Sequence, residues 1–289
     1  METQNKKTVL VTGASGLLGS HVVKELATRD CNIIVSILPF EADTYKASCG
    51  ERVIFNQDIF DANLPHIDSV INCAFARSNN LEHLASAFEF TESLINGFQK
   101  SDIEGIINIS SQGVYKRLPV GEYSREDSPI EPIDTYSVCK FACEKLFAVA
   151  GLKHVTSVRL ASINMKQRFL YKFVEAVKAG NPIALNSPNV YASILDVKDA
   201  ASALASLALL PAEKWAPVYN LGTGKQYSLK EYAEAVKSVG EKLGYNPSIE
   251  LDDNGNASSA GMDVSLLMEA TGWKPAISLP AMIEEMFNW

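Results

Sequence analysis

Short apolar runs rich in β-branched residues alternate with amphipathic stretches over the first 165 residues, and this alternation restricts the fold more than any other feature. Six runs have the length and composition of strands: residues 8–12, 33–38, 52–56, 69–73, 105–109 and 155–160. Helical periodicity separates them, as in a parallel sheet whose strands are joined by crossover helices. The runs are nearly continuous in apolar residues, as expected for strands covered on both faces. The pattern predicts an α/β fold with a Rossmann-type, doubly wound parallel sheet.

The pattern changes after residue 165, where helical stretches such as 169–179 and 229–243 alternate with proline-marked loops. We therefore expect a larger domain over residues 1–165 and a smaller, mainly helical C-terminal domain over residues 166–289. Strand-like segments at 191–195 and 218–221 suggest that the chain returns to the sheet near residues 191–223. The domains are then discontinuous in sequence.

The acidic composition argues against a nucleic-acid partner. The formal net charge is −8, whereas proteins that neutralise nucleic-acid phosphates carry clustered Lys and Arg. The N-terminal residues are polar and lead directly into the first predicted strand, unlike a secretory signal. The apolar stretch around residues 200–210 is too short to span a bilayer as a helix. We expect a cytoplasmic protein with no membrane association.

The cysteines and histidines do not form a recognisable metal-binding pattern. The chain has 5 cysteines, an odd number at scattered positions, which suits reduced thiols in the cytosol. Cys139 and Cys143 share a helix face, but no second pair of ligands has a matching spacing. The four histidines are isolated from one another. We predict no metal site.

A glycine-rich turn follows the first predicted strand and precedes a helical stretch. Glycine lets the chain turn sharply, lets backbone N–H groups approach a pyrophosphate, and lets the helix pack closely on the strand. A simple strand-to-helix turn is the alternative, but the position after the first strand of an alternating pattern favours dinucleotide binding. We therefore interpret residues 1–165 as a dinucleotide-binding domain. The turn residues expected to contact the dinucleotide are Gly13, Ser15, Gly16, Leu17, Leu18 and Gly19.

Tyr136 and Lys140 lie four residues apart in a predicted helix, so their side chains leave the same face. An ammonium near a phenol favours the phenolate and lowers the tyrosine pKa towards neutrality, where it exchanges protons with a hydroxyl or carbonyl group. Such pairs are common on solvated helices. This pair gains weight because Ser110 and Ser111 end a predicted strand at the edge of the sheet where ligands bind.

Together these motifs resemble the extended short-chain dehydrogenase/reductase family, especially its nucleotide-sugar epimerases, dehydratases and reductases. The resemblance includes segments 57–59, 70–74, 219–224 and 263–275. It implies that Ser111 orients the substrate, Tyr136 is the acid/base, and Lys140 also holds the nicotinamide ribose, whereas Ser110 is a structural or secondary polar group. It further implies contacts to the cofactor from Asp58, Ile59, Cys73 and Ala74. We also expect a homodimer.

The cofactor preference follows from a departure from the family pattern. NAD-preferring members end the second strand with an acidic residue, but the corresponding position, eighteen after Gly19, is Ile37. No arginine stands there for a 2′-phosphate either. The sequence predicts NADP or NAD, with a slight preference for NADP, and Glu41 is the alternative contact that would favour NAD.

The substrate site also departs from the family pattern. Dehydratases carry an Asp-Glu pair after the catalytic hydroxyl residue, whereas this chain has Gln112-Gly113, so dehydration is disfavoured. Ser162 replaces a family Asn, and Ala192 replaces an Arg that grips the diphosphate. Arg168 and Lys172, one turn apart, are candidates to replace that Arg, although a solvated basic face explains them equally well. The predicted substrate residues are Gln112, Ser162, Arg168 and Lys172.

Three functions remain open. The first is a 4-keto-6-deoxyhexose 4-reductase that acts on a nucleotide-diphosphate sugar, with hydride from NAD(P)H and a proton from Tyr136. The second is a nucleotide-sugar C4 epimerase that retains NAD and uses the same residues. The third is a non-catalytic dinucleotide-binding regulator, although such relatives typically lack the tyrosine.

Overall fold

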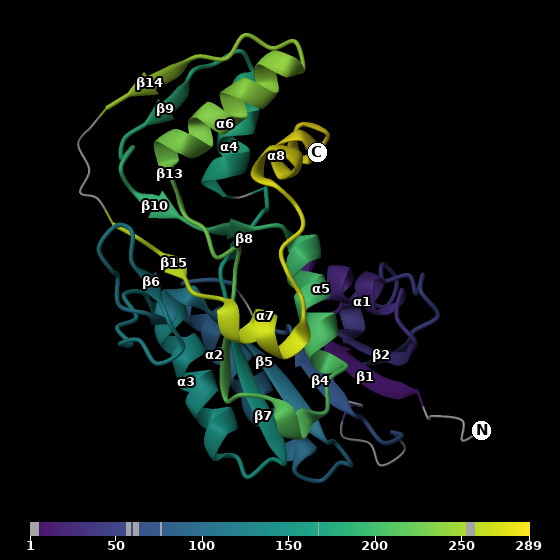
Figure 1. The fold of residues 1–289 in the computed structure, drawn as a ribbon. Helices are drawn as coiled ribbons and strands as arrows, with labels where there is room; N and C mark the ends of the chain where they lie inside the picture. The colour runs from purple at the N-terminus through teal and green to yellow at the C-terminus, as the bar shows by residue number, and fades with distance from the viewer. Residues whose placement is uncertain (1–5, 56–58, 60–63, 76, 167, 253–257) are drawn as a thin grey trace.

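A parallel sheet forms the centre of the molecule (Figure 1). The structure is a computed structural model and describes residues 6–55, 59, 64–75, 77–166, 168–252 and 258–289. In these residues the sheet has seven strands: β1 (Lys7–Thr12), β2 (Cys31–Ile37), β3 (Arg52–Phe55), β4 (Ser69–Asn72), β5 (Gly105–Ser111), β7 (His154–Leu160) and β12 (Val218–Leu221). Their order is β12-β7-β5-β4-β1-β2-β3, so the direction of winding reverses between β1 and β4. This confirms the predicted doubly wound Rossmann-type sheet, in which ligands bind beyond the strand ends at the reversal.

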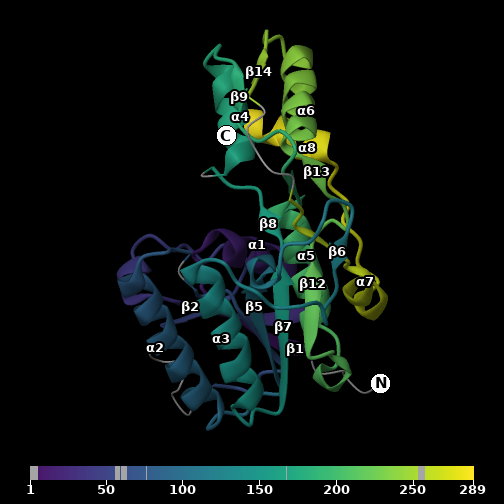
Figure 2. The same ribbon diagram turned by 90° about the vertical axis from the view of Figure 1, so that its left-hand side faces the viewer.

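Each face of the sheet has its own apolar core because successive side chains of a strand point to opposite faces. Val9 and Val11 of β1 belong to one core, and Leu10 between them belongs to the other. Figure 2 shows two of the covering helices side by side on one face. These are α2 (Leu81–Phe98) and α3 (Thr135–Val149); α1 (Leu17–Leu26) and α5 (Val197–Ala208) cover the opposite face.

A separate group of helices surrounds a third core, which lies above the sheet in Figure 1. Their inward faces carry large apolar side chains at helical spacing, such as Leu170, Phe173, Val174 and Val177. The helices are α4 (Phe169–Lys178), α6 (Leu229–Lys242) and α8 (Leu279–Phe287), and β9 (Ile183–Leu185) pairs with β14 (Ile249–Leu251) beside them. We call this group the cap.

The chain returns to the sheet once in the predicted region rather than twice. Residues 218–221 form the edge strand β12 beside β7, as expected. Residues 191–195 were expected to join the sheet, and that prediction is wrong. They divide into β10 (Tyr191–Ala192), which pairs with β13 (Tyr227–Ser228), and β11 (Ile194–Leu195), which pairs with β8 (Ser162–Ile163). The extended segment stays short because Asp196 caps α5 directly after it, by accepting a hydrogen bond from the Lys198 backbone N–H.

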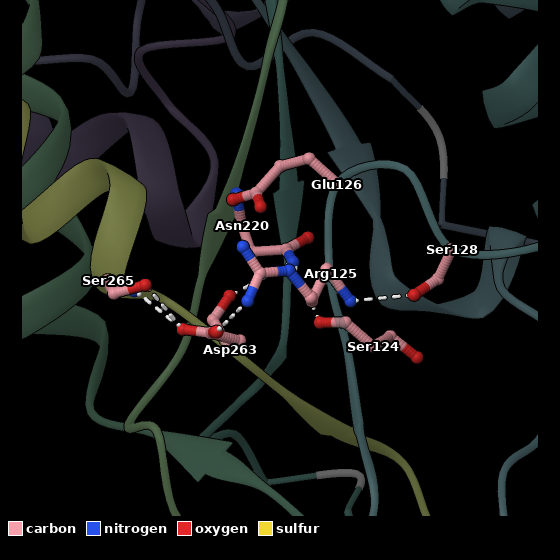
Figure 3. A network of polar contacts seen from close by, with 7 residues as sticks. All are labelled: Ser124, Arg125, Glu126, Ser128, Asn220, Asp263 and Ser265. Atoms are coloured by element: carbon pink, nitrogen blue, oxygen red, sulfur yellow. Dashed lines mark hydrogen bonds and ion pairs between the residues drawn. The ribbon is translucent and has the colours of Figure 1, made fainter.

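A polar network fixes the C-terminal return to the edge strand (Figure 3). The buried Asn220 of β12 donates from Nδ2 to the carbonyl oxygens of Ser124 and Asp263, both at 3.0 Å. Its backbone N–H donates to the Glu126 carboxylate at 2.9 Å. These bonds join β6 (Tyr123–Ser124) and β15 (Gly261–Met262), which pair with each other, to the main sheet. The helix α7 (Ser265–Thr271) follows β15 and packs on β12.

Three short 3-10 helices complete the described elements: η1 (Pro39–Glu41), η3 (Gln112–Val114) and η4 (Ala212–Lys214). Across the described ranges, no helix has both the length and the apolar character needed to cross a membrane. All five cysteines are free, and these ranges contain no cluster of three or more His, Cys, Asp or Glu side chains suited to a metal ion.

Candidate functional site

The glycine-rich turn brings the start of α1 close to the end of β4. Gly13 has φ of +65°, and a Cβ there would meet the Ala74 backbone at 2.9 Å. A Cβ on Gly19 would lie 2.1 Å from the Gly13 carbonyl oxygen, so only glycine lets α1 pack this closely on the turn. Gly16 is the N-cap of α1 and offers no side chain to its first N–H groups. The unpaired backbone N–H groups at the start of α1 can therefore donate to a pyrophosphate, whose negative charge the helix dipole also favours.

One face of α3 lies along the end of β5 and sets the register between them. Lys140 donates from Nζ to the Ile109 carbonyl oxygen at 2.8 Å. One turn further along, the Glu144 carboxylate accepts a hydrogen bond from Ser110, which therefore has the structural role expected of it. Ser111 is the next residue, and its Oγ accepts a hydrogen bond from the Gly113 backbone N–H at 3.1 Å. The hydroxyl of Ser111 retains its own proton for a ligand.

Tyr136 lies in the first turn of α3, where two polar contacts fix the chain. Asp134 caps the helix by accepting a hydrogen bond from the Ser137 N–H at 2.8 Å. The Tyr136 N–H donates to the Asn79 side chain at 3.2 Å. The ring of Phe75 packs edge-on against the Tyr136 ring, with 6.1 Å between ring centres. The phenol is therefore held by contacts that do not involve its hydroxyl group.

Most of the predicted site residues line one cleft of about 370 Å³ at the carboxyl ends of the strands. Its size falls in the usual range of small-molecule sites. The lining includes Gly13, Gly16, Leu17, Leu18, Gly19, Cys73, Ser111, Gln112, Tyr136, Lys140, Ser162 and Arg168. The cleft therefore combines the glycine-rich turn with the Ser, Tyr and Lys side chains.

Four predicted residues lie elsewhere or adjoin the cleft. Ser15 lies in the glycine-rich turn and Ala74 packs against Gly13, but neither lines the cleft. Ile59 is fully buried in the core between the sheet and α2. Lys172 is exposed and outside the lining. Arg168 is the N-cap of α4 and has extended backbone angles. The side chains of Arg168 and Lys172 therefore do not share the helix face that their spacing suggests. Asp58 lies outside the described residues.

The titration of Tyr136 differs from the sequence prediction. Burial raises the pKa of Tyr136 to about 12, and the Arg77 guanidinium opposes this rise. Lys140 Nζ lies 5.8 Å from the centre of the Tyr136 ring and 4.0 Å from that of Phe75. The predicted lowering of the Tyr136 pKa by Lys140 is therefore wrong for the protein alone, because burial dominates and the cation that acts against it is Arg77. Tyr136 is a neutral phenol at neutral pH.

Arginines that the sequence analysis missed also line the cleft. Arg77 and Arg117 lie there with Arg168, and none of the three forms an ion pair within the described ranges. Arg77 donates from Nη1 to the Met165 sulfur at 3.1 Å. Arg77 and Arg117 both follow strands that end at the edge of the sheet where ligands bind. This position in the sequence is the signal by which they could have been predicted.

Two buried polar atoms in the lining have no partner in the described part of the chain. They are Gln112 Oε1, an acceptor, and Arg168 Nε, a donor. Other nitrogens of the same side chains, Gln112 Nε2 and Arg168 Nη2, approach Ser162 Oγ at 3.3 Å and 3.4 Å. An unpaired acceptor and donor beside one serine suit a ligand with neighbouring hydroxyl groups, each of which donates and accepts.

Comparison with known proteins identifies the family. Residues 9–222 match the model of the NAD dependent epimerase/dehydratase family. The chain belongs to this family. UDP-glucose 4-epimerase of Halalkalibacterium halodurans is 25% identical, over 97% of this chain and 95% of the relative. This agrees with the resemblance to extended short-chain dehydrogenases/reductases and supports a nicotinamide dinucleotide as cofactor.

Solved structures of epimerase/dehydratase relatives share the fold over nearly the whole chain. UDP-glucose 4-epimerase of Thermus thermophilus, in complex with NAD, has a TM-score of 0.76 at 22% identity and covers 97% of this chain and 98% of its own. RMD from Pseudomonas aeruginosa, complexed with NADPH, has a TM-score of 0.77 at 19% identity, with 98% coverage of both chains. Both nicotinamide dinucleotides therefore occur on this fold.

We expect dinucleotide affinity to fall as the pH rises through about 8. Burial lowers the pKa of Lys140 to about 8, so its ammonium loses its proton at a lower pH than an exposed lysine does. An uncharged amine donates weaker hydrogen bonds to ribose hydroxyls. Fluorescence titration with NADH at several pH values measures the effect. Lys140→Met should bind more weakly with a nearly flat pH profile, whereas an equally flat wild-type profile would contradict contact between Lys140 and the dinucleotide.

Proposed function

We propose that this protein exchanges a proton and a hydride at C4 of a nucleotide-diphosphate sugar, and that it is a 4-epimerase. One observation carries the proposal: Ser111, Tyr136 and Lys140 line the same cleft as the glycine-rich turn. A proton-transfer group beside a dinucleotide site supports oxidation of an alcohol and reduction of a ketone.

The charge of the cleft supports an anionic substrate. Arg77, Arg117 and Arg168 line it in a chain whose formal net charge is −8. Guanidinium groups without acidic partners are suited to phosphate oxygens, which they bind through paired hydrogen bonds. The related proteins whose names specify UDP-sugars support a nucleotide diphosphate as the anionic part.

The residues of the chain divide the work at C4. A bound nicotinamide dinucleotide supplies or accepts the hydride. Tyr136 exchanges the proton of the C4 oxygen through its phenolic Oη, and the Ser111 hydroxyl donates a hydrogen bond to the same oxygen. Gln112 accepts a hydrogen bond from a sugar hydroxyl through its unpaired Oε1, and Arg168 donates from its unpaired Nε to a sugar or phosphate oxygen beside it. Gln112-Gly113 supplies neither of the two acidic groups that dehydration requires.

The choice of epimerase over reductase rests on relatives rather than on the three site residues, which both reactions share. A relative similar over 97% of this chain is a UDP-glucose 4-epimerase. We therefore place the epimerase before the reductase, which is the reverse of the order expected from the sequence. A 4-keto-6-deoxyhexose 4-reductase is the second candidate. It is favoured by the neutral phenol of Tyr136, which is the acid needed to protonate a ketone oxygen.

One set of incubations tests the proposal. We expect the purified protein to convert UDP-glucose or UDP-N-acetylglucosamine into its 4-epimer, with no net change in the absorbance of reduced dinucleotide. Consumption of one NADH or NADPH per molecule of a nucleotide-diphosphate 4-keto-6-deoxy sugar would establish the reductase instead. Dinucleotide binding without turnover of either substrate class would contradict both enzymes and favour a regulator.

The predicted homodimer also stays a proposal. Exposed apolar side chains on α3 support it, because packing them against a second copy would remove apolar surface from water. Val138 and Leu146 are exposed, and Val149 is 80% exposed.

A further inference from the structure

Glu41 ends the 3-10 helix η1 and reaches back to the glycine-rich turn. Its Oε1 accepts a hydrogen bond from Ser15 Oγ at 2.7 Å. Its Oε2 accepts one from the Leu38 backbone N–H at 2.8 Å. The carboxylate is therefore held between the turn and the end of β2, although Glu41 lies four positions after the last residue of that strand.

The position that the family pattern assigns to an acidic residue is apolar and buried. Ile37 is the last residue of β2, only 2% exposed, and its side chain packs in the core with Val11 and Val35. It has no polar atom to offer a ribose. Directly after it, Leu38 is extended and Pro39 begins η1, whose single turn brings Glu41 over this end of the strand.

The bonding capacity of the Glu41 carboxylate is only half used. An ionised carboxylate has about four acceptor positions, and Ser15 and Leu38 occupy one on each oxygen. One position on each oxygen is left for another donor. The 2′ and 3′ hydroxyl groups of a ribose are two neighbouring donors, and they match this arrangement.

The same carboxylate opposes a 2′-phosphate. A phosphate at that position brings negative charge against Glu41, and like charges in contact disfavour binding strongly. Counter-charge is missing as well: over the described ranges, Glu41 forms no ion pair with lysine or arginine. The Glu41 carboxylate therefore offers two acceptor positions to ribose hydroxyls, whereas its negative charge repels a 2′-phosphate.

We propose that Glu41 makes this protein selective for NAD(H) over NADP(H), in place of the carboxylate missing at position 37. The inference rests on the proposed function only in requiring a dinucleotide bound at the glycine-rich turn. This proposal reverses the preference for NADP expected from the sequence, because the short helix η1 supplies the carboxylate that the end of β2 lacks. Ser15 is the positioning residue that holds Glu41 against the glycine-rich turn.

The alternative explanation is that Glu41 only ties η1 to the glycine-rich turn. Glu41→Gln separates the two roles, because a glutamine keeps both local contacts. Its amide oxygen accepts from the Leu38 N–H, and its NH₂ group donates to Ser15 Oγ. Only the negative charge is lost. Asp43→Asn is the matched control, since it removes an exposed carboxylate two residues further along the same loop.

The test measures dissociation constants of NADH and NADPH for the wild type and both variants by fluorescence titration. We expect the wild type to bind NADH at least about tenfold more tightly than NADPH. In Glu41→Gln this preference should fall by about tenfold or more, mainly through tighter binding of NADPH. Asp43→Asn should leave the ratio within roughly twofold, because an exposed charge is screened by solvent and salt.

Two results would overturn the inference alone: a wild type that prefers NADPH, or a ratio that changes no more in Glu41→Gln than in Asp43→Asn. If the wild type bound neither dinucleotide, the proposed function would fail together with it. Melting temperatures of the three proteins, measured without ligand, should be similar, because Glu41→Gln keeps its local hydrogen bonds and Asp43 is exposed.

Discussion

Tyr136→Phe is expected to lower kcat by about 10²-fold or more, the usual contribution of general acid–base catalysis. The substitution removes only the hydroxyl group. The ring contact with Phe75 and the bond from the Tyr136 N–H to Asn79 do not involve that group, so α3 and the cleft should keep their geometry. The dissociation constant of the dinucleotide should stay nearly constant. Steady-state kinetics and a binding titration on the same preparation measure both quantities.

A matched tyrosine elsewhere controls for general effects of the substitution. Tyr245 lies in the loop after α6, and its ring packs on Phe287 with 5.3 Å between ring centres. Tyr245→Phe should leave kcat and dinucleotide binding unchanged. Full turnover by Tyr136→Phe would assign the proton transfer to another group. Loss of dinucleotide binding would instead point to a structural role for the phenol hydroxyl.

The parts of the site that the sequence predicted lie on regular elements. Gly13 and Gly19 follow a strand and open a helix, where a tight turn leaves little choice of geometry. Tyr136 and Lys140 lie four apart on one helix, and the helical repeat alone puts them on one face. Ser111 ends a strand whose neighbours fix its direction. In each case a local spacing determines where the side chain lies.

The parts that were missed lie in irregular segments. Arg77 and Arg117 follow β4 and η3, and their approach to the cleft depends on the path of loops that have no repeat to reveal it. Glu41 was named only as an alternative, because the bend at Pro39 determines how close it comes to Ser15. No periodicity encodes that bend.

Burial explains the remaining differences. The pKa of Tyr136 depends on how much of the phenol is desolvated, a property of the assembled cleft rather than of the Tyr-x-x-x-Lys spacing. Similarly, residues 191–195 have the composition of a strand, but their neighbours in space are β8 and β13. Composition predicted the extended conformation of these residues and not their partners.

Arg159→Met is expected to destabilise the protein by about 3–5 kcal/mol, because it leaves a buried carboxylate without its counter-charge. The side chains of Arg159 and Glu144 are each 5% exposed, and Nη2 lies 2.9 Å from Oε2. The guanidinium also donates from Nε to Glu144 Oε1 at 3.1 Å and from Nη1 to the Tyr115 hydroxyl at 2.8 Å. Urea unfolding gives the free energy of unfolding for the wild type and variant.

An exposed pair provides the control. Arg29 and Glu25 form an ion pair at 2.7 Å one turn apart on the surface, where such pairs contribute roughly 0–1 kcal/mol. Arg29→Met should therefore change the free energy of unfolding by less than about 1 kcal/mol. Similar losses in Arg159→Met and Arg29→Met would mean that solvent reaches Glu144, contrary to its burial in the structure.

A double variant separates the charge from the rest of the network. Arg159→Met/Glu144→Leu removes both charges of this pair together, and apolar replacement of a buried ion pair is often close to neutral. Recovery of stability should be incomplete, because Ser110 loses its acceptor on Glu144 and a buried unpaired hydroxyl costs about 1–3 kcal/mol.

Ser110 directly precedes Ser111, so the double variant should also have a lower kcat than its stability alone would explain. A double variant as stable as the wild type but with reduced kcat would show that this ion pair serves mainly to align β5 with α3. A fully active double variant would show that Lys140 and its bond to Ile109 fix that alignment without Glu144.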